Sequence, residues 1–199
     1  MSMNCSILGL TPAQIDGLVA TPALATDVVL VAWDETRKAQ LEASRATDNR
    51  DRVAKERQVR IAEGRERIAR LGSFELPLNL EKWWHSVHYL LTGEIGPVGG
   101  ARGLLLTAGR ELGEDMGYGR ARLHSPTEAK EFSRFLETQD LANLQARMSL
   151  EDMGHLYPRR LSEDDLDNLR DNVGCEFVRL QDYVHKICDR GNGLLIWVI

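Results

Sequence analysis

The sequence lacks a long apolar run, a basic leader and regularly spaced cysteines, the marks of membrane and secreted proteins. No stretch approaches the roughly 18 consecutive apolar residues of a membrane-spanning helix. Residues 1–10 lack the basic and apolar segments of a signal peptide. The three cysteines, Cys5, Cys175 and Cys188, form no CxxC pair, a pattern typical of reduced thiols. We therefore expect a cytoplasmic protein without a membrane partner.

Recognisable catalytic and metal-binding motifs are also missing. The sequence contains no GxSxG elbow, no HExxH motif, no zinc-type cysteine spacing and no GxxxxGK[ST] phosphate loop. Its 30 acidic and 25 basic residues give a formal charge of −5, which argues against a general nucleic-acid binder. We expect no metal and no cofactor. Whether the chain is an enzyme stays open, with a preference for a non-enzymatic role.

The apolar pattern indicates a strand at each end of the chain. Residues 3–7 alternate apolar and polar side chains, which predicts a strand that Gly9 ends. Residues 194–199 form an uninterrupted apolar run, which is typical of a strand buried on both faces. We expect these two strands to pair. The predicted fold is α+β, a small mixed sheet that includes the N- and C-terminal strands and is packed by several helices.

Helix starts are marked by capping signals. Residues 11–14 (Thr-Pro-Ala-Gln) and 125–128 (Ser-Pro-Thr-Glu) each form a capping box with proline at the first helical position. Asn79 is a suitable N-cap for a tryptophan- and histidine-containing helix over 80–92. A last helix is expected over 176–189.

Residues 34–71 differ in composition from the rest of the chain. They hold eleven Lys/Arg and eight Asp/Glu, with few and mostly small apolar residues. We interpret them as a charged helical insertion of one or two solvated helices within a single domain spanning residues 1–199. The interleaved acids argue against nucleic-acid binding by this segment, because phosphate binding requires a face of one sign.

A candidate ligand site combines the helix over 80–92 with the glycine-rich segment 93–119, which holds nine of the 17 glycines. Together these segments offer an acid, a base and an anion-binding group, as a small hydrolase or a ligand sensor requires. The same residues could equally form a structural network of hydrogen bonds, which is the interpretation we favour. The candidate residues are Lys82, His85, His88, Glu114, Asp115, Tyr118 and Arg122.

A candidate partner surface lies in the acidic stretch 161–176. An acidic surface suits a basic partner, because complementary charge accelerates encounter. We therefore favour a non-enzymatic protein-binding role, with another protein as the partner, by analogy with immunity proteins that neutralise toxins. The oligomeric state stays open. The residues of this surface are Glu163, Asp164, Asp165, Asp167 and Asp171.

The order of the motifs resembles a known family. The chain reads KWWHxxHxxLTG at 82–93, GEDMGYGxAR at 113–122 and Tyr-Pro at 157–158, followed by a final helix and a Gly-x-Gly strand. This order resembles the YfbM-like family, a bacterial family of unknown function, over residues 1–32 and 74–199. The family often has proline where this chain has Arg120. The resemblance implies an α+β fold with helices around a small sheet, and it implies no established reaction, cofactor or catalytic residue.

Overall fold

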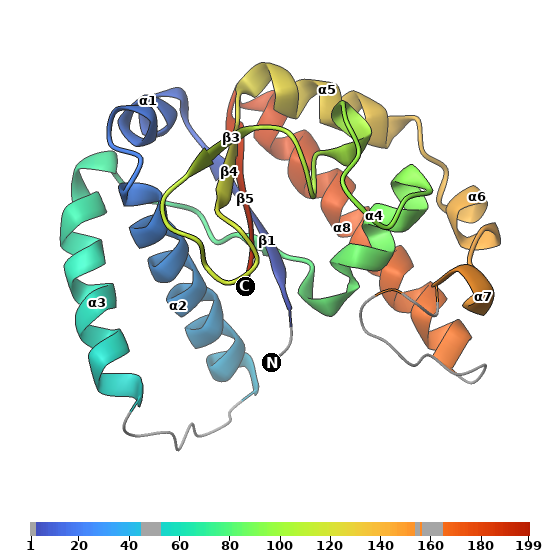
Figure 1. Cartoon of the computed structure of the whole chain (residues 1–199), viewed down its shortest axis with the longest axis horizontal. Coiled ribbons are helices and arrows are strands. Elements are labelled where there is room, and N and C mark those ends of the chain that lie inside the picture. Colours follow the sequence, from blue (N-terminus) through green and yellow to red (C-terminus); the bar gives the residue numbers. More distant parts are fainter. Residues whose placement is uncertain (1–2, 45–52, 154–155, 157–164) are drawn as a thin grey trace.

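The computed structural model describes residues 3–44, 53–153, 156 and 165–199. Figure 1 shows the sheet at the centre, with helices on both faces. In chain order the elements, with η for a 3₁₀ turn, are β1 (Cys5–Leu10), α1 (Pro12–Ala20), α2 (Leu24–Ser44), α3 (Val53–Ile68), η1 (Ala69–Leu71), β2 (Leu78–Asn79), η2 (Glu81–Trp83), α4 (Trp84–Thr92), η3 (Ala101–Gly103), β3 (Arg110–Leu112), β4 (Ala121–His124), α5 (Pro126–Glu137), α6 (Leu141–Ala146), α7 (Leu150–Met153), α8 (Asp165–Asp189) and β5 (Gly193–Val198).

The sheet has the strand order β2-β1-β5-β4-β3. The terminal strands β1 and β5 pair along their whole length, from Cys5 opposite Val198 to Leu10 opposite Gly193. This confirms the α+β fold and the predicted pairing of the first and last strands. Every pairing is antiparallel, where a mixed sheet was expected. All residues of β5 are buried, because helices cover both faces of the sheet centre.

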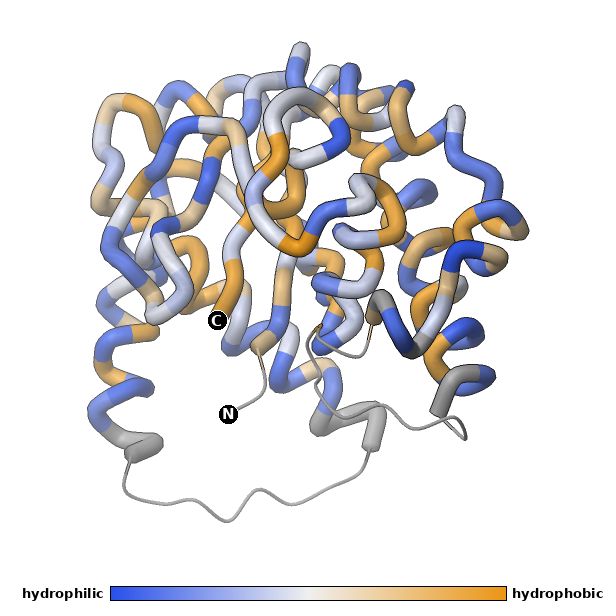
Figure 2. The backbone as a smooth tube through the Cα atoms, turned by 45° about the vertical axis from the view of Figure 1, so that its right-hand side comes forward, coloured by the Kyte–Doolittle hydropathy of each residue, from blue (hydrophilic) through white to orange (hydrophobic). Residues whose placement is uncertain are grey.

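Two apolar layers lie on the two faces of the sheet. One contains side chains from α4, α5 and α8, among them Trp84, Phe132 and Phe177. The other contains side chains from α1 and α2, and it includes Val28 and Trp197. Helix α3 lies outside α2, antiparallel to it, so the two helices form a hairpin beside the sheet (Figure 1). Along α3, hydrophilic and hydrophobic segments alternate (Figure 2).

Several helices and strands begin or end at other residues than predicted. Helix α2 begins at Leu24, so the charged segment that starts at residue 34 continues a helix whose earlier turns, with Val28 and Ala32, are buried. Helix α8 begins at Asp165 instead of residue 176, because Leu169 and Val173 continue its buried stripe. Gly9 lies within β1 and does not end it; a Cβ there would lie 2.1 Å from the Cδ1 of Ile187.

Two of the three predicted N-caps are confirmed. Both predicted capping boxes form, with Thr11 and Ser125 as N-caps of α1 and α5. Gly93 ends α4 in the left-handed conformation at φ 75°, which glycine adopts without steric cost. The prediction for Asn79 is wrong: its side chain accepts a hydrogen bond from the Glu81 N–H at 2.8 Å, but Leu80 is the N-cap of η2 and α4 begins at Trp84.

Candidate functional site

The two histidines of α4 hold the glycine-rich segment through its backbone. The His85 Nε2 lies 3.0 Å from the Ile95 carbonyl oxygen, and the His88 Nε2 lies 3.0 Å from the Gly96 carbonyl oxygen. Because a carbonyl oxygen only accepts, each Nε2 is assigned the proton. His88 is fully buried, and this burial lowers its pKa. Protonating its buried Nδ1 would add a donor that has no partner among the described residues.

Arg122 reaches the same segment from β4. Its Nη2 donates to the Leu105 carbonyl oxygen at 2.9 Å, and burial lowers the pKa of the guanidinium. His85, His88 and Arg122 therefore converge on residues 93–107, and each of them holds one carbonyl oxygen. This is the arrangement of a structural network that fixes a loop.

The other predicted ligand-site residues lie elsewhere. The Glu114 N–H donates to the Thr26 hydroxyl of α2 at 2.8 Å, and the Asp115 carboxylate accepts from two backbone N–H groups of its own loop, at 2.7 and 3.1 Å. Tyr118 is exposed. These three residues follow β3 on the α2 side of the sheet, where Leu112 packs, whereas the α4 histidines lie on the opposite side.

Lys82 is exposed on η2, with its Nζ 4.6 Å from the ring centroid of Trp83. Three of the seven candidate residues thus contact segment 93–107, each at a different carbonyl oxygen, whereas Glu114, Asp115 and Tyr118 lie on the other side of the sheet. Among the described residues, no three His, Cys, Asp or Glu side chains are grouped to hold a metal ion. Within the same part of the chain, every helix is too short or too polar to cross a membrane.

The predicted partner surface is only partly described. Glu163 and Asp164 lie outside the described residues, and Asp165 opens α8 without a described side chain. Asp167 and Asp171 are exposed one turn apart on α8. The Asp167 side chain pairs with Arg170 at 3.3 Å. It is nevertheless 93% exposed, so solvent can still reach its carboxylate.

Two further titratable groups, the His124 imidazole and the Cys5 thiol, are buried. His124 on β4 is fully buried, and neither ring nitrogen has a hydrogen-bond partner among the described residues. Burial lowers its pKa to about 4, so the ring is neutral at neutral pH. Burial likewise raises the pKa of the Cys5 thiol to about 12, so this group is not a thiolate nucleophile.

A groove lies at the base of the α2–α3 hairpin, and sequence reasoning missed it. Its volume is about 230 Å³. One wall is a single face of α2, and the other is the chain from the end of α3 to the start of β2. We call it the α2 groove; its lining is Val28, Val31, Ala32, Glu35, Arg65, Ile68, Ala69, Gly72, Ser73, Phe74, Glu75, Leu76 and Pro77.

The floor of the α2 groove is apolar and its rim is open. Val28, Ala32 and Ile68 are buried, whereas Leu76 is 56% exposed. The helical spacing of Val28, Val31, Ala32 and Glu35 marks one face of α2 in the sequence. That spacing could not reveal the groove, because the facing wall comes from a segment about 40 residues further along the chain.

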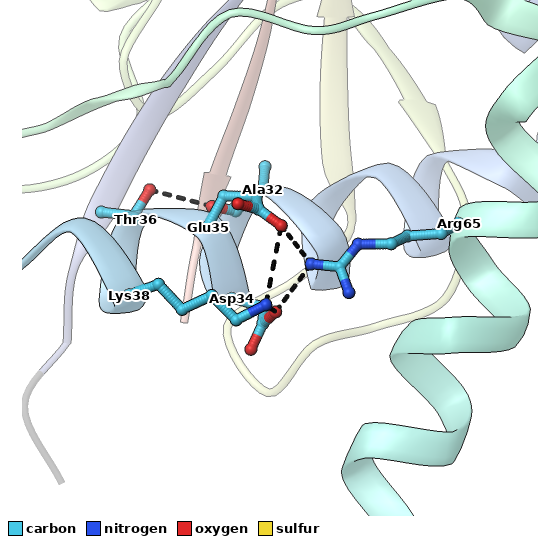
Figure 3. A network of polar contacts seen from close by, with 6 residues as sticks. All are labelled: Ala32, Asp34, Glu35, Thr36, Lys38 and Arg65. Carbon is cyan, nitrogen blue, oxygen red and sulfur yellow. Dashed lines mark hydrogen bonds and ion pairs between the residues drawn. The ribbon is translucent and has the colours of Figure 1, made fainter. Parts of the chain in front are cut away.

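A network of ion pairs joins α2 to α3 at Glu35 and Arg65, two of the residues that line the α2 groove (Figure 3). The Arg65 Nη2 reaches from α3 to Asp34 Oδ2 at 2.9 Å and also donates to Glu35 Oε1. Lys38 Nζ lies 2.8 Å from Asp34 Oδ2 and 3.8 Å from Glu35 Oε1. Burial alone would raise the pKa of Asp34, but hydrogen bonds and charge from Lys38 and Arg65 outweigh it and lower that pKa. On the other wall, Glu75 pairs with Arg190.

Comparison with known proteins identifies the family. A profile of the family described as a domain of unknown function (DUF1877) matches residues 1–197. The chain belongs to the DUF1877 family. A crystal structure of YfbM from Escherichia coli, a protein of unknown function, is similar over 100% of both chains, with a TM-score of 0.63 and 15% sequence identity. The resemblance found in the motif order is therefore confirmed, and it extends to the fold. No curated protein matches the chain.

Within this DUF1877 chain, the two polar arrangements differ in what they offer a ligand. The α4 histidines and Arg122 are already engaged with carbonyl oxygens of segment 93–107. The α2 groove combines an apolar floor, an open rim and polar groups at its mouth. Those features are typical of small-molecule sites, which are concave and mostly apolar with few polar groups.

Proposed function

We propose that this chain acts by binding a small molecule in the α2 groove, without converting it chemically. The observation that carries the proposal is the groove itself, about 230 Å³ between α2 and residues 65–77. Burying an apolar ligand there is favourable by about 25 cal/mol per Å² of apolar surface removed from water. The apolar floor supplies this contribution without any catalytic group.

The walls of the α2 groove are held in place before a ligand enters. The guanidinium of Arg67 on α3 binds the carboxylate of Asp27 on α2, and Arg65 bridges the same two helices beside the mouth. A site that is already formed avoids the entropy cost of ordering its walls on binding. The groove is therefore suited to binding small ligands that offer few contacts.

The test is a thermal-shift screen of small molecules with a groove-filling variant. Val31 is half-buried in the lining, so Val31→Trp fills the α2 groove from its rim. Val178→Trp, on an exposed face of α8, is the matched control. We expect ligands that raise the melting temperature of the unmodified chain. Their effect should disappear in Val31→Trp and persist in Val178→Trp. Ligands that act equally on both variants, or an empty screen, would refute the proposal.

A second candidate is recognition of a basic partner protein by the start of α8, including neutralisation of the immunity-protein type. The observation that favours it is the exposure of Asp167 and Asp171 on consecutive turns. Asp167→Asn with Asp171→Asn should slow association with such a partner, more strongly at low salt. An unchanged association rate would remove this surface from consideration.

The alternative of a small hydrolase built on segment 93–119 has weaker support. Catalysis requires a base within reach of its substrate, whereas His85 and His88 each use Nε2 to hold a backbone carbonyl. Glu114, which could have supplied a carboxylate, lies in the loop on the other side of the sheet.

A further inference from the structure

We infer that the ligand of the α2 groove is an uncharged, largely apolar molecule about the size of two fused aromatic rings. The inference rests on the proposed function, and it adds the chemical class of the ligand. Three features of the groove carry it: its volume, the pairing of the charges at its mouth and the aromatic side chain in its wall.

The volume sets the size of the ligand. A cavity of about 150 Å³ lined by aliphatic and aromatic side chains accommodates benzene. The α2 groove, at about 230 Å³, is roughly half as large again. That ratio is close to the ratio between a fused bicyclic ring and a single ring. A larger ligand would have to extend past Leu76 into solvent, where it gains little burial.

The charges at the mouth favour an uncharged ligand. Of the lining residues, Glu35 is paired with Arg65, and Glu75 is paired with Arg190. An anion would share Arg65 with Asp34 and Glu35, and a cation would share Glu35 or Glu75 with a base that is already paired. These pairs are partly exposed and already neutralised, so sharing one adds little affinity, while the ligand's charge has to leave water. A neutral molecule avoids this cost.

The aromatic ring of Phe74 favours a flat ligand. Phe74 lines the groove and is half-buried, opposite the α2 face that contains Val28 and Ala32. Offset or edge-to-face contact between two rings contributes beyond the area that it buries. An aliphatic ligand of equal volume would lack this contact.

The experiment compares probes that share one ring system and differ in charge. The probes are indole, the anion indole-3-acetate and the cation tryptamine, with binding measured by calorimetry or ligand-observed NMR. We expect indole to bind about tenfold more tightly than either charged probe, and more tightly than the single-ring probe phenol. Binding of indole should disappear in Val31→Trp, persist in Val178→Trp and weaken several-fold in Phe74→Leu.

The outcomes separate this inference from the proposed function. Charged probes that bind in the groove as tightly as indole would overturn the inference and leave the proposed function standing. The same conclusion would follow if the screen found a ligand specific to the groove but indole did not bind. Binding of N-acetyl-tryptophanamide more tightly than indole would make the occupant a side chain of a partner protein, which overturns the inference. If no molecule binds in the groove, both fail.

Discussion

Arg67 and Asp27 connect α3 to α2 through two parallel hydrogen bonds, Nε to Oδ2 at 2.7 Å and Nη2 to Oδ1 at 2.6 Å. The Asp27 residue is only 7% exposed, so its carboxylate depends on this guanidinium. Gly64 allows the approach, because a Cβ there would lie 3.2 Å from Asp27 Oδ1. The hairpin of α2 and α3 is therefore joined by a planar, two-bond contact that only arginine makes.

The first prediction concerns this contact. Arg67→Lys keeps the charge and removes the two-bond geometry, so we expect a lower melting temperature and faster amide exchange along α3. Hydrogen-exchange mass spectrometry checks the second effect. Arg60→Lys, at an exposed position of the same helix, is the control and should change neither quantity. Equal changes in the two variants would show that the geometry of the Arg67 contact is unimportant.

The second prediction concerns pH. Burial lowers the pKa of His124 from 6.5 to about 4, so between these values the unfolded chain binds a proton that the folded chain does not. Stability is therefore full above pH 6.5 and falls as the pH is lowered towards 4. His124 contributes about 2–3 kcal/mol to this loss between pH 7 and 4.5. The charge of Glu128 opposes the shift and that of Arg122 reinforces it.

Urea unfolding at the two pH values measures this effect. His124→Phe should show a smaller loss between pH 7 and 4.5 than the unmodified chain, whatever its baseline stability. His88, whose pKa is also lowered, keeps contributing in both proteins. An undiminished loss in His124→Phe would contradict the assigned cause.

The third prediction concerns the packing of α8 on β1. Gly9→Ala places a methyl group 2.1 Å from Ile187 Cδ1, so we expect a destabilisation of about 1–3 kcal/mol from overpacking. Ile187→Val removes Cδ1 and should recover part of that loss in the double variant. A double-mutant cycle by urea unfolding measures the coupling. Strictly additive effects would show that the two side chains do not clash.

The fourth prediction concerns the glycine-rich segment. His88→Leu leaves the Gly96 carbonyl without its donor, which should cost about 1–3 kcal/mol and accelerate amide exchange over residues 93–107. His85→Leu should have a smaller effect, because His85 is only half-buried and water can replace its bond. A larger effect at His85 than at His88 would contradict the importance of burial.

Local signals in the sequence predicted local structure well. Thr11 and Ser125 cap helices because their hydroxyls, the following prolines and the partner side chains three residues on are all contained in four consecutive residues. The start of α8 was missed because its first turns are acidic, and the buried Leu169 and Val173 provide only two points of the helical period.

Contacts between residues far apart in the chain could not be predicted from the sequence. The spacing of His85 and His88 places both on α4, but only the folded chain brings Arg122 to the same loop and moves Glu114 to the opposite side of the sheet. The α2 groove is a stronger example, because its two walls meet only when α3 folds back on α2. Neither the contact of Arg122 with the loop nor the meeting of the two groove walls leaves a periodicity or a motif in the sequence.

The central pairing of β1 with β5 has a consequence for synthesis. The ribosome makes β1 long before β5, so the nascent chain carries β1 without its main partner while the elements between them are synthesised. Strand β4 also pairs with β5, so the β2–β1 pair and the β4–β3 pair are joined into one sheet only by β5. The sheet is therefore completed only once β5 has been made, and the apolar Ile7 and Leu8 are side chains that chaperones would have to shield until then.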